Sequence, residues 1–348
     1  MPKPRRSTHA AVAEQLGLRI IDKDELTFAR RPHGEHFRYV DAEGGALPPE
    51  RRREIEALVL PPAWSDVAIA ADGRAHLQAI GRDGQGRVQY RYHDDWARVR
   101  DAVKAERLRA FGRALPRIRE RVERDLARPL SDRRAVLATA VRLIDRQLLR
   151  VGGERYAAMG TRGASTLEAR NTRVKNGRVE LRYRAKAGKK VSLRLRDKRL
   201  ADRVKRLRRM KGRRLFAWRD ETGTRRRLGA SQINEYLVDL AHGHLGRRPA
   251  IQVSAKDFRT FAASALAVED LCAAKADTPT ARKRALAAAM RRVAERLRNT
   301  PAVARSSYVH PLVVRAFEAD ELDPGLVRGP VREGLDHAET GLMRLLER

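Results

Sequence analysis

The sequence predicts an α+β protein in which a small β-rich domain precedes a larger, mainly helical one. Short segments of alternating polar and apolar residues, separated by turn signals, fill the stretch from about residue 21 to 93. Beyond residue 94, apolar residues recur at helical spacing over long segments. The 348 residues are enough for two such domains. We therefore expect a basic flexible arm over 1–20, a β-rich domain over 21–93 and a helical domain over 94–348.

The balance of charge indicates a polyanionic partner. The chain has 76 Lys and Arg against 44 Asp and Glu, a formal net charge of +32, while 42% of its residues are hydrophobic and can form a core. A folded chain this basic repels itself unless it binds a polyanion, so nucleic acid is the first candidate and an anionic membrane the second. The sequence has no apolar run of about 18 residues and no signal peptide. We expect a cytoplasmic, nucleoid-associated protein that does not enter a membrane.

The elements of the N-terminal domain are predicted from the turns between them. Asp41–Gly45, Asp72-Gly73 and Asp83–Gly86 are turn sequences, and Pro61-Pro62 stops a preceding helix. The expected elements are strands at 36–40, 67–71, 75–80 and 87–93, and a helix from about 48 to 60.

The last of these strands carries a mixed polar and aromatic pattern. In a strand, Gln89, Arg91 and His93 share one face, and Tyr90 and Tyr92 share the other. Arginine and glutamine beside aromatic rings suit a DNA groove, where they contact base edges and phosphates. An amphipathic strand whose tyrosines belong to the core explains the pattern equally well.

The C-terminal domain is predicted to be mostly helical. Val136, Ala140, Leu143 and Leu148 mark the core side of one helix. The expected helices cover about 95–112, 115–128, 132–149, 199–209, 231–242, 255–270, 279–298 and 326–347, with strands at 178–184 and 190–195 joined by a turn at 185–188.

A helix–turn–helix junction near residue 300 presents a tyrosine. Thr278-Pro279 begins one helix, which ends near Asn299 because the residue before a Thr-Pro start is pushed out of helical geometry. Thr300-Pro301 begins a second, shorter helix that Pro311 closes, with Tyr308 about two turns into it. The junction therefore aims an amide and a phenol at one point. A lone tyrosine is more often an ordinary half-buried residue.

Several common kinds of chemistry leave no trace in the sequence. It contains no Walker loop and no Gly-x-Gly-x-x-Gly, so we expect no nucleotide cofactor. No acidic cluster has the spacing of a two-metal site, so we expect no metal. Cys272 is the single cysteine, which excludes a disulfide framework and a cysteine zinc site.

Four features remain, and each has an ordinary explanation by itself. Arg150 follows a buried helix, where the helix dipole favours a cation. Lys186 lies at a hairpin tip, where a solvated lysine is usual. Lys256 and Arg259 are three apart on one helix and share a face, which a solvated basic face explains. The fourth feature is the Asn299–Tyr308 junction.

In this order, the residues resemble the type IB DNA topoisomerases of the poxvirus and bacterial kind. The matching segments are Arg-Val-Gly-Gly-Glu-Arg-Tyr, Tyr-Arg-Ala-Lys-Ala-Gly-Lys, Lys-Asp-Phe-Arg-Thr and Ser-Tyr-Val-His-Pro, over nearly the whole chain from about residue 20. The resemblance implies the fold that this family shares with tyrosine recombinases and five catalytic residues, Arg150, Lys186, Arg259, Asn299 and Tyr308. It also implies DNA contacts by Gln89, Tyr90, Arg91, Tyr92, Tyr156 and Lys256. Gly153 and Asn171 depart from the family pattern, which usually has asparagine and histidine there.

The resemblance also implies a reaction. Tyr308 attacks a phosphodiester and forms a covalent phosphotyrosine, and Lys186 protonates the leaving 5′ oxygen. Arg150, Arg259 and Asn299 bind the non-bridging oxygens, where charge builds in the transition state. A monomer closes as a clamp on duplex DNA and relaxes supercoils without ATP or metal.

Two other functions explain part of this pattern. A tyrosine recombinase shares the nine-residue spacing between Asn299 and Tyr308, but it usually has histidine in the place of Lys256 and a helical N-terminal domain. A non-catalytic DNA-binding or chromatin protein explains the charge but not the ordered set of residues.

Overall fold

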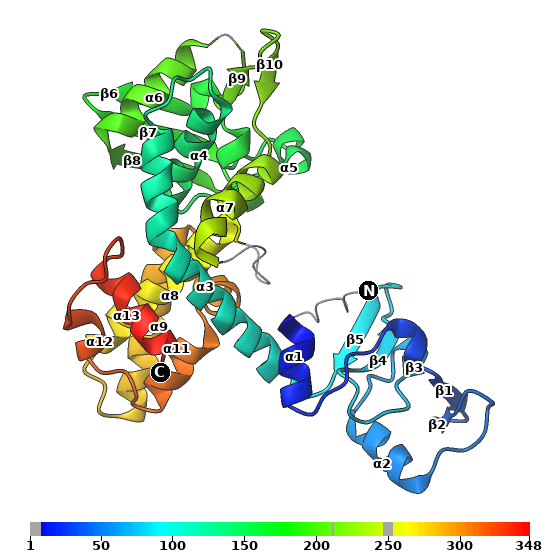
Figure 1. Cartoon of the computed structure of the whole chain (residues 1–348). Helices are drawn as coiled ribbons and strands as arrows, with labels where there is room; N and C mark the ends of the chain where they lie inside the picture. Colours follow the sequence, from blue (N-terminus) through cyan, green and yellow to red (C-terminus); the bar gives the residue numbers. More distant parts are fainter. Residues whose placement is uncertain (1–7, 211, 246–252) are drawn as a thin grey trace. The chain divides into compact units, whose positions relative to one another are not determined.

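The computed structural model describes residues 8–210, 212–245 and 253–348. The chain forms two compact units, Met1–Lys104 and Ala105–Arg348, which divide inside helix α3 (Trp96–Asp125) (Figure 1). The first unit is built on a β-sheet and the second is mainly helical, so the predicted fold class is confirmed. The domain bounds 21–93 and 94–348 stay predictions. Within the described ranges, no helix has both the length and the apolar composition needed to cross a membrane.

The first unit contains a five-stranded antiparallel sheet in the order β2-β1-β3-β4-β5. Its strands are β1 (Phe28–His33), β2 (His36–Val40), β3 (Ser65–Ile69), β4 (Leu77–Arg82) and β5 (Val88–Tyr92), and helix α2 spans Pro49–Ala57. Strand β1 was not predicted from the sequence. Its Arg30 is buried and donates to the carbonyl oxygens of Leu60, Pro61 and Trp64, so a charged residue stands where the alternating pattern requires an apolar one.

The prediction of a flexible arm over 1–20 is wrong for residues 8–20. Helix α1 spans Thr8–Gln15, and Ala13 and Leu18 are buried in a cluster with Trp96 and Val99. This segment is held by apolar contacts with residues about 80 positions later in the chain, and the composition of the segment itself does not indicate such contacts. Residues 1–7 lie outside the described part.

Helix α3 is one long helix where two were predicted. The chain was expected to form helices at 95–112 and 115–128, but α3 continues through Pro116. A proline inside a helix costs about 3 kcal/mol. Phe111, Leu115 and Ile118 flank it and are buried in the main core, and each contributes roughly 1.5–3 kcal/mol, which offsets that cost.

Further helices follow in the second unit, most of them within a few residues of the predictions, although those at 154–158 and 311–318 were not predicted. The helices are α4 (Arg133–Gln147), α5 (Glu154–Ala158), α6 (Lys198–Arg209), α7 (Ala230–Leu245), α8 (Ala255–Cys272), α9 (Pro279–Leu297), α10 (Pro301–Ser307), α11 (Pro311–Glu318), α12 (Gly325–Arg328) and α13 (His337–Leu346). Pro311 begins α11 and does not close α10, because proline suits a first helical turn as well as a helix stop. The predicted helix 326–347 is divided into α12 and α13, with Pro330 between them.

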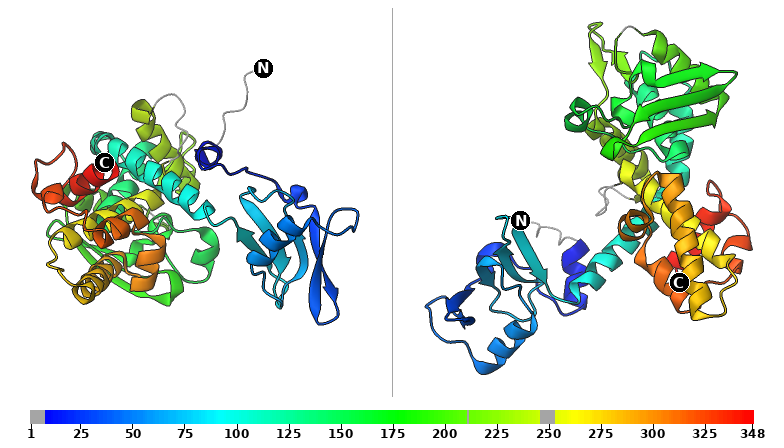
Figure 2. Two further views of the ribbon diagram at one scale, coloured as in Figure 1. Left: turned by 90° about the horizontal axis from the view of Figure 1, so that it is seen from below. Right: turned by 180° about the vertical axis from the view of Figure 1, so that it is seen from behind.

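A three-stranded antiparallel sheet in the order β6-β7-β8 covers part of the second unit (Figure 2). Its strands are β6 (Thr172–Lys175), β7 (Arg178–Arg184) and β8 (Lys190–Arg196). The β7–β8 hairpin confirms the strands predicted at 178–184 and 190–195. A second, two-stranded sheet of β9 (Ala217–Arg219) and β10 (Arg225–Arg227) was not predicted.

Candidate active site

Residues from four separate segments meet in the second unit. Arg150 follows α4, Arg259 lies in α8, Asn299 lies between α9 and α10, and Tyr308 caps the end of α10. Arg150 Nη2 donates to Asn299 Oδ1 at 2.6 Å. The guanidinium carbon of Arg259 lies 4.8 Å from the centre of the Tyr308 ring. Four of the five predicted catalytic residues are therefore close together, and their catalytic roles stay predictions.

The capping residues of α9 and α10 place Asn299 and Tyr308. Thr278 Oγ1 accepts from the Ala281 amide at 3.1 Å, and Thr300 Oγ1 accepts from the Val303 amide at 3.3 Å, as the two Thr-Pro pairs predicted. Between the helices, Arg298 takes a left-handed conformation with φ of 57°, which turns the chain so that Asn299 faces back toward α4.

Helix α8 holds the backbone around the tyrosine. Ser264 is fully buried, and its hydroxyl donates to the Tyr308 carbonyl at 3.4 Å and accepts from the His310 amide at 3.0 Å. Both bonds come from the helix that carries Arg259, so the tyrosine and its neighbouring guanidinium are attached to one rigid element.

Arg259 ties together the ends of the helices that precede Arg150 and Asn299. It is 3% exposed, and its Nη atoms donate to the carbonyl oxygen of Leu148, just after α4, and to that of Leu297, the last residue of α9, the latter at 3.1 Å. Burial lowers the pKa of Arg259, and the phenol of Tyr308 partly offsets this by raising that pKa. Lys256, three residues earlier, is exposed, so the two residues do not form a solvated basic face.

The site contains buried donors without acceptors. Across the described part of the chain, neither Nε of Arg259 nor Nδ2 of Asn299 has a hydrogen-bond partner. Buried polar groups are nearly always paired, and an unpaired donor costs about 1–3 kcal/mol. An anion with several oxygens, such as a phosphodiester, supplies the acceptors that these two donors lack.

The environment of Tyr308 favours its ionised form. Burial raises the pKa of the phenol, but the charges of Arg259 and Arg150, with a contribution from the nearby Asn299 side chain, outweigh burial and lower the pKa below the ordinary tyrosine value. A lowered pKa makes the phenol a better nucleophile near neutral pH.

Two further residues beside the site, Arg298 and Tyr183, were not predicted from the sequence. The Arg298 guanidinium donates from both Nη atoms to the Gln147 carbonyl, at 2.8 and 2.7 Å, and burial lowers its pKa to about 10. Burial raises the pKa of Tyr183 in β7, although Arg298, Arg259 and Arg150 act against that shift. In the sequence, Arg298 could have been found as a site residue because it is adjacent to Asn299. For Tyr183 the only such signal was its position three residues before Lys186.

Lys186 is the fifth predicted catalytic residue, and it lies at the tip of the β7–β8 hairpin as predicted. Its exposed side chain lines a cavity of about 310 Å³ together with Arg150 and Tyr156. Tyr156, in α5, is 53% exposed at this cavity. The structure therefore places the lysine on the same hollow as Arg150.

The predicted DNA contacts of the first unit lie on β5. The Tyr90 and Tyr92 rings stack with centres 6.1 Å apart, so they share a face as predicted. Tyr92 packs against the core, whereas Tyr90 is 41% exposed, so a core role accounts for only one of them. Gln89 donates to Asp83 at 2.8 Å, and Arg91 pairs with Asp94 at 3.2 Å.

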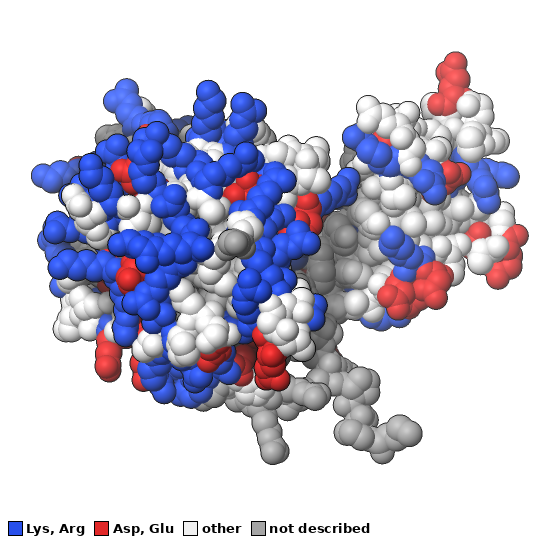
Figure 3. Space-filling view, turned by 90° about the horizontal axis from the view of Figure 1, so that it is seen from above, with Lys and Arg blue, Asp and Glu red and all other residues white. Residues whose placement is uncertain are grey.

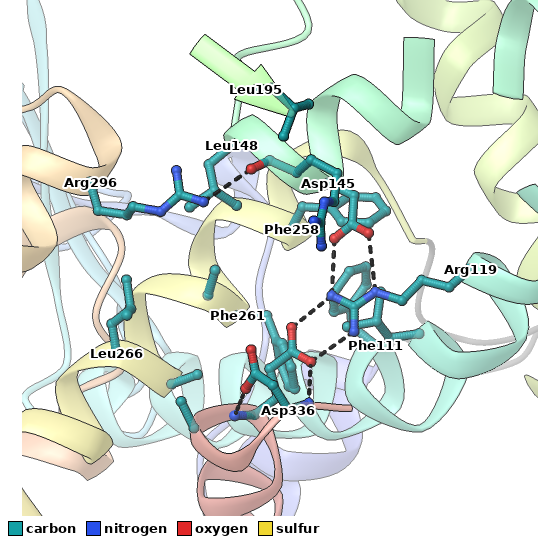
Figure 4. Close-up of a pocket in the computed structure, with 16 residues that line it drawn as sticks. Phe111, Arg119, Asp145, Leu148, Leu195, Phe258, Phe261, Leu266, Arg296 and Asp336 are labelled. Carbon is teal, nitrogen blue, oxygen red and sulfur yellow. Dashed lines mark hydrogen bonds and ion pairs between the residues drawn. The ribbon is translucent and has the colours of Figure 1, made fainter. Parts of the chain in front are cut away.

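A charged network and a cavity lined by both charged and apolar side chains lie beside α8 (Figure 4). Arg119 of α3 donates to Asp145 of α4 at 3.0 and 3.1 Å and to Glu339 of α13 at 2.7 and 2.8 Å. Leu148, Phe258 and Phe261 line the adjoining cavity. The network thus joins α13 to α4, the helix that precedes Arg150.

Two family models match the chain. Residues 93–320 match the catalytic core of eukaryotic DNA topoisomerase I, and residues 36–83 match the N-terminal domain of bacterial DNA topoisomerase IB. Among curated proteins, the chain is 30% identical over 273 residues to DNA topoisomerase 1B of Acanthamoeba polyphaga mimivirus, an alignment that covers 76% of this chain and 79% of that protein.

Proposed function

The chain belongs to the type IB DNA topoisomerase family, and from that membership we propose how its own residues perform the reaction. It is a DNA topoisomerase, an isomerase whose substrate is DNA. We propose that it cuts one strand of supercoiled duplex DNA and forms a covalent 3′-phosphotyrosine at Tyr308. The cut strand then rotates and is resealed.

The observation that carries this proposal is the meeting of Arg150, Arg259 and Asn299 around Tyr308. The phenolate oxygen attacks the phosphorus, and negative charge builds on the two non-bridging oxygens. Three groups donate to those oxygens: Arg150, Nε of Arg259 and Nδ2 of Asn299. The last two have no hydrogen-bond partner among the described residues. These donors take the place that metal ions hold in other phosphoryl-transfer sites.

Lys186 acts as the general acid. As the bond between phosphorus and the 5′ oxygen breaks, its electron pair goes to the oxygen, which takes a proton from the ammonium group. The cavity that Lys186 shares with Arg150 supports this assignment. The phosphotyrosine keeps the energy of the broken phosphodiester, so resealing needs no ATP.

DNA binding relies on the net charge of +32 and on residues of both units. Lys and Arg cover much of the visible face of the larger unit (Figure 3). We assign contacts with the duplex to Gln89, Tyr90, Arg91, Tyr92, Tyr156 and Lys256. In this proposal the protein works as a monomer that closes around duplex DNA, in the cytoplasm and associated with the nucleoid.

Neither alternative function accounts for both family matches. A tyrosine recombinase usually has a helical N-terminal domain, whereas residues 36–83 match a type IB N-terminal domain and the first unit is a β-sheet. A non-catalytic DNA-binding protein has no need of the catalytic core matched by residues 93–320.

The test uses supercoiled plasmid with a chelator and without nucleotide. We expect relaxation by the wild-type protein and none by Tyr308→Phe, which lacks the attacking oxygen but retains DNA binding in a gel-shift assay. Tyr39→Phe removes the same atom from β2 and is the matched control, with activity retained. An absolute need for magnesium, or a covalent adduct in Tyr308→Phe, would sink the proposal.

A further inference from the structure

One buried carboxylate in the second unit has an unusual number of cationic partners. Glu168 is 1% exposed, and it accepts from Arg162 at 3.1 and 2.6 Å, from Arg170 at 2.6 Å and from Arg213 at 2.7 Å. Burial raises the pKa of Glu168, but Arg162 and Arg170 outweigh it and hold the pKa below its usual range. An ionised carboxylate at this depth persists only because the guanidiniums surround it.

Arg162 faces the interior of the protein and is not available to bind DNA. Its side chain is 8% exposed. Nε and Nη2 donate to Glu168, and Nη1 donates to the carbonyl oxygens of Ala157 at 2.7 Å and Thr161 at 2.9 Å. All three nitrogens are therefore engaged, and the guanidinium fixes the loop that follows α5.

This loop bonds to the strand that leads to Lys186. The backbone amide of Arg162 donates to the carbonyl oxygen of Arg184 at 2.6 Å. Asn171 makes a second tether, because its Oδ1 accepts from the Glu168 amide at 3.0 Å and its Nδ2 donates to the carbonyl oxygen of Arg182 at 3.1 Å. Glu168 is thus connected to β7 at two alternate residues.

The two tethers stand where strand pairing stops. Strand β6 pairs with β7 only from Arg178 to Leu181, so Arg182 and Arg184 have no partner in β6. Their carbonyl oxygens point to the same edge, since alternate residues of a strand are equivalent. Asn171 and Arg162 donate hydrogen bonds to these two carbonyl oxygens, the second of which directly precedes Ala185-Lys186.

We infer that Glu168, through Arg162 and Asn171, positions Lys186 for proton transfer to the leaving oxygen. The inference rests on the proposed role of Lys186 as general acid. Lys186 itself is exposed at a hairpin tip, so its placement depends on the strand below it. Arg162 also lines the cavity that Lys186 shares with Arg150, which puts the tether beside the reacting groups.

The test measures single-turnover cleavage of two substrates, one with the ordinary 5′ oxygen and one with sulfur in the bridging position. A thiolate leaves without a proton, so the sulfur substrate needs no general acid. Lys186→Ala should lose about 10²–10⁴ in cleavage of the oxygen substrate and recover with sulfur. We expect Glu168→Gln to lose about 10–100-fold with oxygen, the cost of a small misplacement, and to recover to within about threefold of wild type with sulfur.

Two further variants separate positioning from loss of structure. Glu339→Gln alters another buried carboxylate, the one held by Arg119, which makes no hydrogen bond or ion pair with β7 or β8 among the described residues, so any defect it causes should persist with sulfur. Asn171→Ala removes the second tether without changing a charge and should behave as Glu168→Gln does, which keeps the test valid if Glu168→Gln folds poorly.

The outcomes distinguish the inference from the function on which it rests. If sulfur rescues Lys186→Ala but leaves the Glu168→Gln and Asn171→Ala defects at full size, the positioning role is refuted and the general acid stands. If sulfur rescues none of the three, Lys186 is not the general acid and the inference is overturned with that assignment.

Discussion

Replacing Asn299 with aspartate separates stability from catalysis at the active site. In the wild-type protein, Asn299 Oδ1 accepts from Arg150 at 2.6 Å, and Nδ2 is a buried donor without a partner in the described residues. Asn299→Asp keeps the acceptor for Arg150 and gives it a full charge. It also exchanges the donor that faces the phosphate for an oxygen that repels it.

The two consequences have opposite signs. A hydrogen bond to a charged group contributes about 1.5–3 kcal/mol against about 0.5–1.5 for a neutral one, so the free energy of unfolding should stay level or rise by about 1 kcal/mol. Loss of one donor to a developing oxyanion costs about 10²–10³ in rate. Asn299→Ala should show that loss, and Asn299→Asp should be at least about tenfold slower still, because it adds a negative charge beside the phosphate.

Single-turnover cleavage and denaturant unfolding, measured on both variants, check this reasoning. The control is Asn176→Asp, in the turn between β6 and β7, which makes the same chemical change and should leave cleavage unchanged. If Asn299→Asp cleaves as fast as wild type, or no slower than Asn299→Ala, then Asn299 does not donate to the phosphate.

Two other predictions follow from the geometry. Because Arg259 and Arg150 lower the pKa of Tyr308, the cleavage rate should rise with pH through a pKa below the ordinary value of about 10, and Arg150→Ala should move that limb to higher pH; a pH profile unchanged in the variant would contradict it. Arg119→Met should lower the free energy of unfolding by about 3–5 kcal/mol, since it leaves the buried Glu339 and the half-buried Asp145 without their cation. Arg124→Met, which breaks an exposed pair in the same helix, should cost under about 1 kcal/mol, and equal losses in chemical denaturation would refute the argument.

Local rules predicted the elements that carry the catalytic residues. The Thr-Pro pairs at 278 and 300 determine where α9 and α10 begin, because a threonine cap and a proline in the first turn act within a few residues of each other. The β7–β8 hairpin followed from alternation and a turn in the same way. Pro311 shows the limit of such rules, because one residue type is compatible with either end of a helix.

The sequence by itself determined the strong positive charge, the order of the five candidate catalytic residues and most helix and strand bounds, all of which depend on neighbouring residues. Only the tertiary structure decided that α3 continues through Pro116 and that Arg259 joins the ends of α4 and α9. It alone also decided that Glu168 accepts hydrogen bonds from Arg162 and Arg213 near the strand that leads to Lys186. Each of these depends on burial and on partners distant along the chain. A sequence does not distinguish a buried arginine from a solvated one, and only the surrounding fold determines which arginine lies beside the tyrosine.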